Sequence, residues 1–130
     1  MYTIDVDPSS NLLTLELSGF LSVEEIARCM GDMGAAFRQH RMKAGYLLLI
    51  DTSGCSVQLQ EVLGAFQTHA AAFPKARRIA VVNTSSLIRM QVRRVLTQSY
   101  MRLFESVAEA RAWLFSEHQP AAPDVAVAGA

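Results

Sequence analysis

Four polar side chains follow the most apolar run of the chain, and they are the first candidates for a binding site. The run over residues 45–50 reads Gly-Tyr-Leu-Leu-Leu-Ile, and after it come Asp51, Thr52, Ser53 and, three residues later, Ser56. A carboxylate and three hydroxyls at one place could form a polar rim for a partner or ligand. The hydroxyl of Ser53 or Ser56 could instead accept a phosphate, although nearby carboxylates would repel it. Alternatively, these side chains bond the backbone of their own turn, as short polar residues often do.

A second polar group follows the next predicted strand, residues 78–82, which shows no alternation. It consists of Asn83, Thr84 and Ser85, and one of these side chains or Ser86 must cap the helix that begins there. Apart from capping, the free amides at that helix end favour an anion. Because ligands of open α/β sheets gather at the carboxyl ends of the strands, we expect the two polar groups to form one shallow cleft.

Arginines lie on the outward face of the helix expected over residues 86–99. Arg89, Arg93 and Arg94 share that face, and Lys75, Arg77 and Arg78 extend the basic strip. A solvated surface explains such a strip. The alternative is docking onto an acidic protein partner, in which charge would chiefly set orientation and association rate.

Composition excludes several classes of function. Twelve basic and twelve acidic residues cancel, which argues against a nucleic-acid-binding protein. No apolar run approaches the roughly 20 residues of a membrane span, and the first residues do not resemble a signal peptide. The two cysteines form no disulfide framework, so we expect a reducing, cytoplasmic location.

The chain also lacks the signatures of catalysis. Its three histidines, His40, His69 and His118, show no metal-ligand spacing. No Walker loop, dinucleotide fingerprint or nucleophile elbow is present. Cys55 has no basic neighbour within its loop to favour a thiolate. We therefore expect no metal, no cofactor and no enzymatic activity.

The apolar periodicity predicts a single α/β domain over residues 1–117. Alternating runs at 2–6 and 13–17 form an antiparallel hairpin at a sheet margin. Two runs without alternation, at 46–50 and 78–82, form internal strands. With a short strand at 102–105, these make one mixed five-stranded sheet, parallel beyond the hairpin, covered by about four helices. The marginal hairpin could pair with a second copy in a homodimer. Residues 118–130 are expected to form a flexible tail.

The chain resembles the STAS family, the anti-sigma-factor-antagonist fold, and within it the SpoIIAA-like branch. The resemblance rests on the order and spacing of four segments, residues 17–22, 48–54, 78–82 and 104–114. It implies a non-enzymatic regulatory or protein-interaction module. Kinase-switched members carry Asp-Ser-Ser-Gly where this chain reads Leu59-Gln60-Glu61-Val62, so the switch serine is not carried over.

A relationship in fold to SEC14-related lipid carriers suggests an alternative function. The protein could carry or sense a small apolar ligand held between helix and sheet. Met30, Met33, Phe37 and Phe66 lie at helical spacing and are either core residues or the lining of such a pocket.

Overall fold

The computed structural model describes residues 1–116 except Val57 and Leu59, so the tail expected over 118–130 lies outside the described residues. The elements of the described chain are, in order, β1 (Tyr2–Asp7), β2 (Leu12–Gly19), α1 (Val23–Gln39), β3 (Leu47–Cys55), α2 (Gln60–Ala72), β4 (Arg78–Val82), α3 (Ser86–Val95), β5 (Met101–Phe104) and α4 (Val107–Leu114).

The strands form one mixed sheet in the order β1-β2-β3-β4-β5. The hairpin β1–β2 is antiparallel, and every other neighbouring pair is parallel. The predicted fold class, with the hairpin at a margin, is therefore confirmed. Because the strands follow one another in order and parallel crossovers are right-handed, the three crossover helices lie on one face of the sheet.

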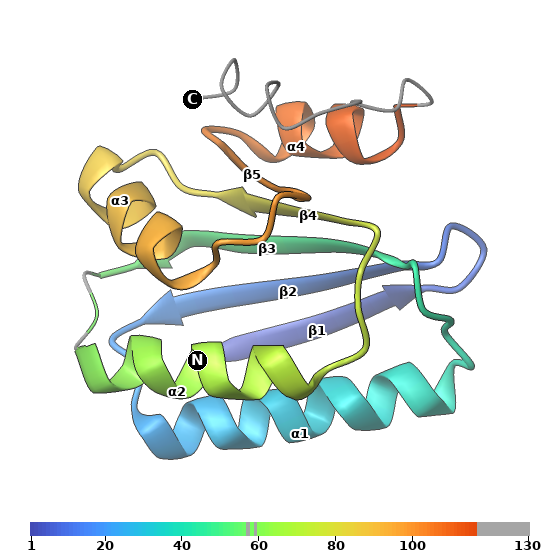
Figure 1. The fold of residues 1–130 in the computed structure, drawn as a ribbon, viewed down its shortest axis with the longest axis horizontal. Coiled ribbons are helices and arrows are strands. Elements are labelled where there is room, and N and C mark those ends of the chain that lie inside the picture. Colours follow the sequence, from blue (N-terminus) through green and yellow to red (C-terminus); the bar gives the residue numbers. More distant parts are fainter. Residues whose placement is uncertain (57, 59, 117–130) are drawn as a thin grey trace.

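The sheet has helices on both faces. Figure 1 shows α1 and α2 side by side along one side of the sheet and α4 on the other. Successive residues of β3 point to opposite faces, so Leu48 and Ile50 join the core beneath α1 and α2 while Leu47 and Leu49 join the core beneath α4. Burial on both faces explains the unbroken apolar run of this strand.

Serine residues begin three of the helices. The side chains of Ser22, Ser85 and Ser106 each accept a hydrogen bond from the backbone N–H three residues later. The capping predicted for the third helix is therefore confirmed, with Ser85 as the capping residue.

The central strand β3 is longer than predicted. The turn expected at Asp51–Gly54 is wrong, because parallel pairing with β2 continues as far as Cys55, past an irregularity between Glu16 and Ser18. Gly54 allows a close approach between strands rather than a turn. A Cβ atom there would lie 3.0 Å from the Cβ of Ser18.

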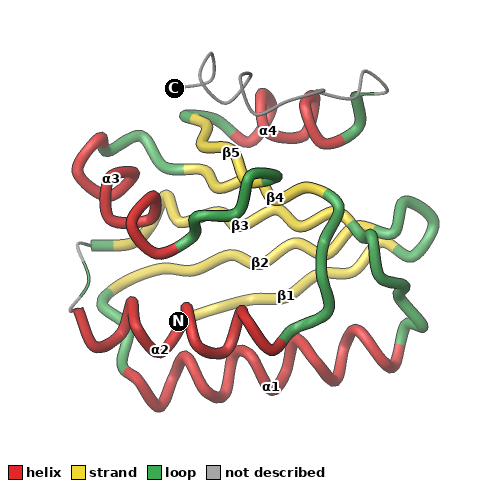
Figure 2. Tube along the Cα trace, in the orientation of Figure 1, coloured by secondary structure: helices red, strands yellow, loops and turns green. Residues whose placement is uncertain are grey.

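Helix α3 is shorter than predicted and ends at Val95. Ser99, the last residue of the predicted helix, lies instead in the following loop and is exposed. Gln98 also lies outside the helix, and its side chain lines a cavity. The loop from Leu96 to Tyr100 instead crosses back toward β5 (Figure 2).

Arg78 does not belong to the exposed basic strip. It is buried, and its guanidinium donates hydrogen bonds to the carbonyl oxygens of Trp113 and Ser116 at the end of α4, over 2.6 and 3.0 Å. Its guanidinium also lies over the Trp113 ring. Burial lowers the pKa of Arg78, and Arg77 and Arg102 lower it further. The carbonyl-rich end of α4 compensates this charge, so Arg78 joins the helix to the sheet.

Candidate functional site

The carboxyl ends of β3 and β4 lie side by side, as the sequence predicted. Asp51 is paired with Val82, so Thr52 and Asn83 are neighbours. The side-chain amide of Asn83 donates to the carbonyl and the hydroxyl oxygens of Thr52 over 2.6 and 3.0 Å. Thr52 in turn donates its hydroxyl to the carbonyl of Val82.

Thr52 and Asn83 are therefore parts of the structure, not of an accessible rim. Only 7% of Thr52 and 2% of Asn83 is exposed. The side-chain oxygen of Asn83 accepts a hydrogen bond from the backbone N–H of Ser85. The expectation that these two residues line a surface cleft is wrong, because the longer β3 carries Thr52 into the sheet.

Other polar residues of the predicted site do reach the surface at this edge. Ser53, Ser56 and Thr84 are exposed, and Asp51 is half-buried. Asp51 accepts a hydrogen bond from the backbone N–H of Ser53. This agrees with the alternative hypothesis that these side chains bond the backbone of their own segment. Ser85 is partly buried as the cap of α3, so its hydroxyl is already engaged.

The arginines of α3 differ in their surroundings. Arg89 donates to the backbone carbonyl of Asn83 over 2.8 Å and lies 3.7 Å from the carboxylate of Glu105. Arg93 and Arg94, one turn later, are exposed. Arg89 therefore supports the β4–α3 turn, while Arg93 and Arg94 present charge to solvent.

Three large apolar side chains at this edge are exposed, and sequence reasoning missed them. Phe20 is 59% exposed in the loop after β2, and Leu87 and Met90 on α3 are 55% and 52% exposed. The outward direction of Leu87 and Met90 follows from helical phase once Ile88 and Val92 face inward. No signal in the sequence marks Phe20. We call Phe20, Ser53, Ser56, Thr84, Leu87 and Met90, which follow the carboxyl ends of β2, β3 and β4, the carboxyl-edge surface; Ser53 lies on its far side from α3, beside Thr3 and Glu16.

Gln58 links the loops beneath this surface. Its side chain accepts from the backbone N–H of Leu21 and donates to the carbonyls of Gly19 and Ser56. Its backbone exchanges two hydrogen bonds with the side chain of Gln91 on α3. These bonds hold the loop after β2, the loop after β3 and α3 together, so the edge is preorganised.

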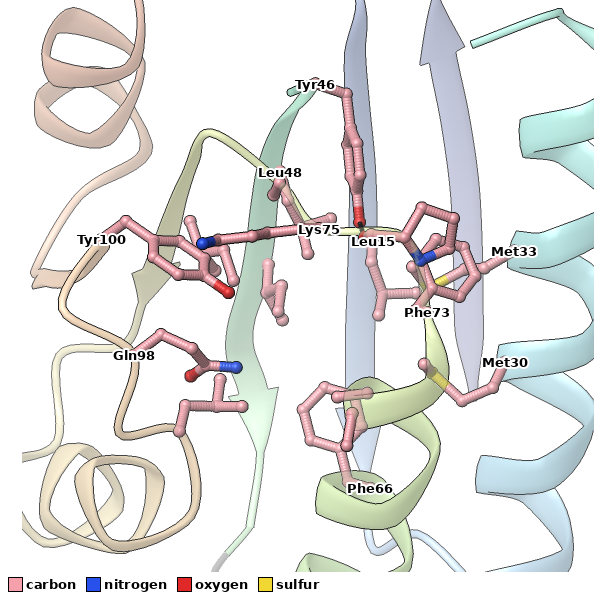
Figure 3. A pocket seen from close by; sticks show the side chains of 17 residues that line it. Leu15, Met30, Met33, Tyr46, Leu48, Phe66, Phe73, Lys75, Gln98 and Tyr100 are labelled. Atoms are coloured by element: carbon pink, nitrogen blue, oxygen red, sulfur yellow. Dashed lines mark hydrogen bonds between the residues drawn. The ribbon is translucent and has the colours of Figure 1, made fainter. Parts of the chain in front are cut away.

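A cavity of about 230 Å³ lies at the opposite end of the sheet, between the sheet, α1, α2 and the loop after α3 (Figure 3). Met30, Met33 and Phe66, three of the four candidate pocket residues, line it. Phe37 does not, and packs edge-to-face against Tyr46 and Phe73 in the wall beside it. The cavity therefore lies near the start of β3, away from the residue 51–57 loop.

Polar groups stand at one side of this apolar cavity. The side-chain oxygen of Gln98 is buried with no hydrogen-bond partner among the described residues. Lys75 and Tyr100 also line the cavity, with the Lys75 ammonium over the Tyr100 ring (Figure 3). An apolar space with one unsatisfied acceptor is suited to an apolar molecule that carries a hydrogen-bond donor.

The described residues show no arrangement for metal binding or thiol catalysis. Within residues 1–116, apart from the two positions left out, no group of three His, Cys, Asp or Glu side chains is placed to hold a metal ion. Burial raises the pKa of the Cys29 thiol to about 12 and also raises that of Cys55. In the same part of the chain, no helix combines the length and apolar character needed to cross a membrane.

Comparisons with known proteins agree with the architecture. An anti-sigma factor antagonist from Mycobacterium paratuberculosis is similar in structure, with a TM-score of 0.65 and 13% identity over 89% of this chain and 94% of that one. A Shewanella loihica PV-4 protein of the DUF3478 family, with a SpoIIAA-like fold, has a TM-score of 0.65 and 17% identity over 88% and 92% of the two chains. At these identities the likeness shows the fold alone. No curated protein matches the chain.

The decisive comparison is with protein families. The family model described as SpoIIAA-like matches residues 12–115, which run from the second strand to the end of the last helix. The match therefore covers the sheet from β2 onward together with all four helices, and the chain belongs to the SpoIIAA-like family.

Proposed function

We propose that the protein is a non-enzymatic regulatory module that binds a protein partner through the carboxyl-edge surface. The observation that carries this proposal is the exposure of Phe20, Leu87 and Met90 at the end of the sheet where Ser53, Ser56 and Thr84 are also exposed. Exposed large apolar side chains among polar ones are typical of protein–protein contacts.

Two further observations support a protein partner. The hydrogen bonds of Gln58 fix the loops of the edge before any partner arrives, which lowers the entropic cost of association. A structural neighbour is described as an anti-sigma factor antagonist, a name that denotes action on another protein.

The absence of catalysis is part of the proposal. The raised pKa of each cysteine keeps the thiol protonated near neutral pH, so neither is a ready nucleophile. Ser53 and Ser56 act as contact residues rather than phosphoacceptors, because a phosphate on Ser53 would face the carboxylate of Asp51. The two free thiols fit a reducing cytoplasm.

Affinity capture with variants tests the proposal. The full chain, immobilised, should retain a specific partner from lysate of its own cells, and Leu87→Glu or Ser53→Asp should reduce retention at least about tenfold, as losing a central contact does. Phe115→Glu is the matched control, because Phe115 is an exposed apolar residue at the far end of α4. Equal retention by all three variants would contradict the proposal.

The cavity favours a second candidate function, the carriage or sensing of a small apolar ligand. Its lining is apolar except at Lys75, Gln98, Tyr46 and Tyr100. The Tyr46 hydroxyl already donates to the carbonyl of Pro74, whereas the side-chain oxygen of Gln98 lacks a donor. In this function the ligand would be an apolar molecule that carries a hydroxyl group, buried between α2 and the sheet.

Native mass spectrometry tests whether the purified protein carries such a ligand. The purified full chain should carry added mass that denaturation removes, and Ala70→Phe, which fills the cavity from α2, should lose it. Ala35→Phe, on the exposed side of α1, is the control. A spectrum without added mass after expression in several hosts would rule the candidate out.

A further inference from the structure

A groove runs along the outer edge of β5, and we propose that it binds an acidic, extended segment of a protein partner as a sixth strand of the sheet. This inference rests on the proposed function, because it names the chemistry of a partner segment. It adds a second contact beside the carboxyl-edge surface.

The edge of β5 offers backbone groups for pairing. β5 is the last strand in the sheet order. The carbonyls of Tyr100 and Phe104 accept hydrogen bonds from the N–H groups of Ile79 in β4 and of Asn83 just after it. The alternate residue Leu103 therefore points its N–H and C=O away from β4. Among the described residues, nothing pairs with these two groups. An unpaired strand edge of this kind is a template for an added strand.

Side chains shape the groove along that edge. It measures about 460 Å³ and is lined by Leu103 and Phe104 of β5, by Arg89 and Arg93 of α3, and by Arg102, Glu105 and Glu109. The groove therefore combines two apolar residues of β5 with three arginines, contributed by α3 and β5, and two glutamates. Glu105 is already near Arg89, at 3.7 Å, and among the three arginines of the groove Arg93 is the exposed one.

Charge decides the kind of segment that fits. Three arginines, Arg89, Arg93 and Arg102, and two glutamates, Glu105 and Glu109, line the groove, so this edge of β5 carries a net positive charge. The other sheet edge, β1, carries Asp5 and Asp7. An acidic strand is therefore attracted to β5 and repelled from β1, which makes one edge of the sheet selective.

A blocked, fluorescein-labelled peptide of about eight residues, alternating valine and glutamate, serves as the acidic probe, since strand addition recognises alternate side chains. We expect it to bind the full chain and to protect the outward amide of Leu103 from hydrogen exchange. The amides of Arg102 and Phe104, which already face β4, should change less. Arg93→Glu should raise the dissociation constant at least about fivefold, while Arg28→Glu, an exposed arginine of α1, should leave it unchanged.

A peptide of alternating valine and lysine is the charge-reversed probe. Equal affinity for both peptides would overturn the inference, as would binding without protection of Leu103 or protection of β1 instead. Concentration-dependent self-association that protects Leu103 in the absence of peptide would assign the edge to a second copy and would also overturn it.

The two proposals fail separately. Loss of cellular partner capture in Leu87→Glu together with no peptide binding at β5 would sustain the carboxyl-edge surface and refute the groove. Peptide binding at β5 with unchanged partner capture by Leu87→Glu and Ser53→Asp would sustain the groove and refute the carboxyl-edge surface.

Discussion

At the scale of single residues, the structure separates side chains that hold the sheet together from those that meet solvent. Thr52 and Asn83 belong to the first group, because each uses its side chain to satisfy buried neighbours on the adjoining strand. Ser53, next to Thr52 in the chain, points to the other face and is exposed. Successive residues of β3 point to opposite faces of the sheet, so neighbouring polar residues of similar type are alternately buried and exposed.

Substitutions at Thr52 and Asn83 should measurably weaken folding. Thr52→Val keeps the shape but loses the hydroxyl, and should lower the free energy of unfolding by about 1 kcal/mol. Asn83→Ala should cost about 2 kcal/mol, because it leaves the backbone N–H of Ser85 without its acceptor.

Urea denaturation of both single variants and of the double variant measures these changes in the free energy of unfolding. Because the two residues share a hydrogen bond, the combined loss should be smaller than the sum of the single losses. Ser53→Ala, a surface control, should stay within about 0.5 kcal/mol of the unaltered chain. Strict additivity of the buried pair would contradict the hydrogen bond between them.

At the scale of elements, sequence periodicity predicted the type and order of every helix and strand described. The periodicity did not predict where an element ends when long-range contacts determine that end. The extension of β3 past Ile50 depends on its register with β2, and the early end of α3 depends on the loop that carries Gln98 to the cavity. Neither is encoded in a local pattern.

Two glycines should respond in opposite ways to the same substitution. A Cβ atom at Gly64 in α2 would meet nothing within 4 Å, so Gly64→Ala should raise the free energy of unfolding by about 1 kcal/mol. Gly45 has a φ of +82°, so Gly45→Ala should lower it by about 1 kcal/mol. Thermal and urea unfolding of the two variants would test this. Destabilisation by Gly64→Ala would indicate that α2 has a different environment.

At the scale of the whole molecule, the sheet gives the protein two distinct ends. The carboxyl ends of the parallel strands carry the exposed apolar and hydroxyl side chains, and the cavity lies near their amino ends. The general location of the candidate site could be predicted from the sequence, because an apolar run followed by polar residues marks a strand end. Its composition could not, since the exposure of Phe20 and the burial of Asn83 depend on how loops and strands pack.

Site-specific photocrosslinking in the cells that make the protein tests the partner-binding role of the carboxyl-edge surface most directly. Benzoylphenylalanine would be placed at position 87, and at position 115 as a control, since both native side chains are exposed and apolar. If this surface binds the partner, we expect a discrete protein adduct from position 87 and none from position 115. Adducts from position 115 alone, or none from either position, would contradict this role.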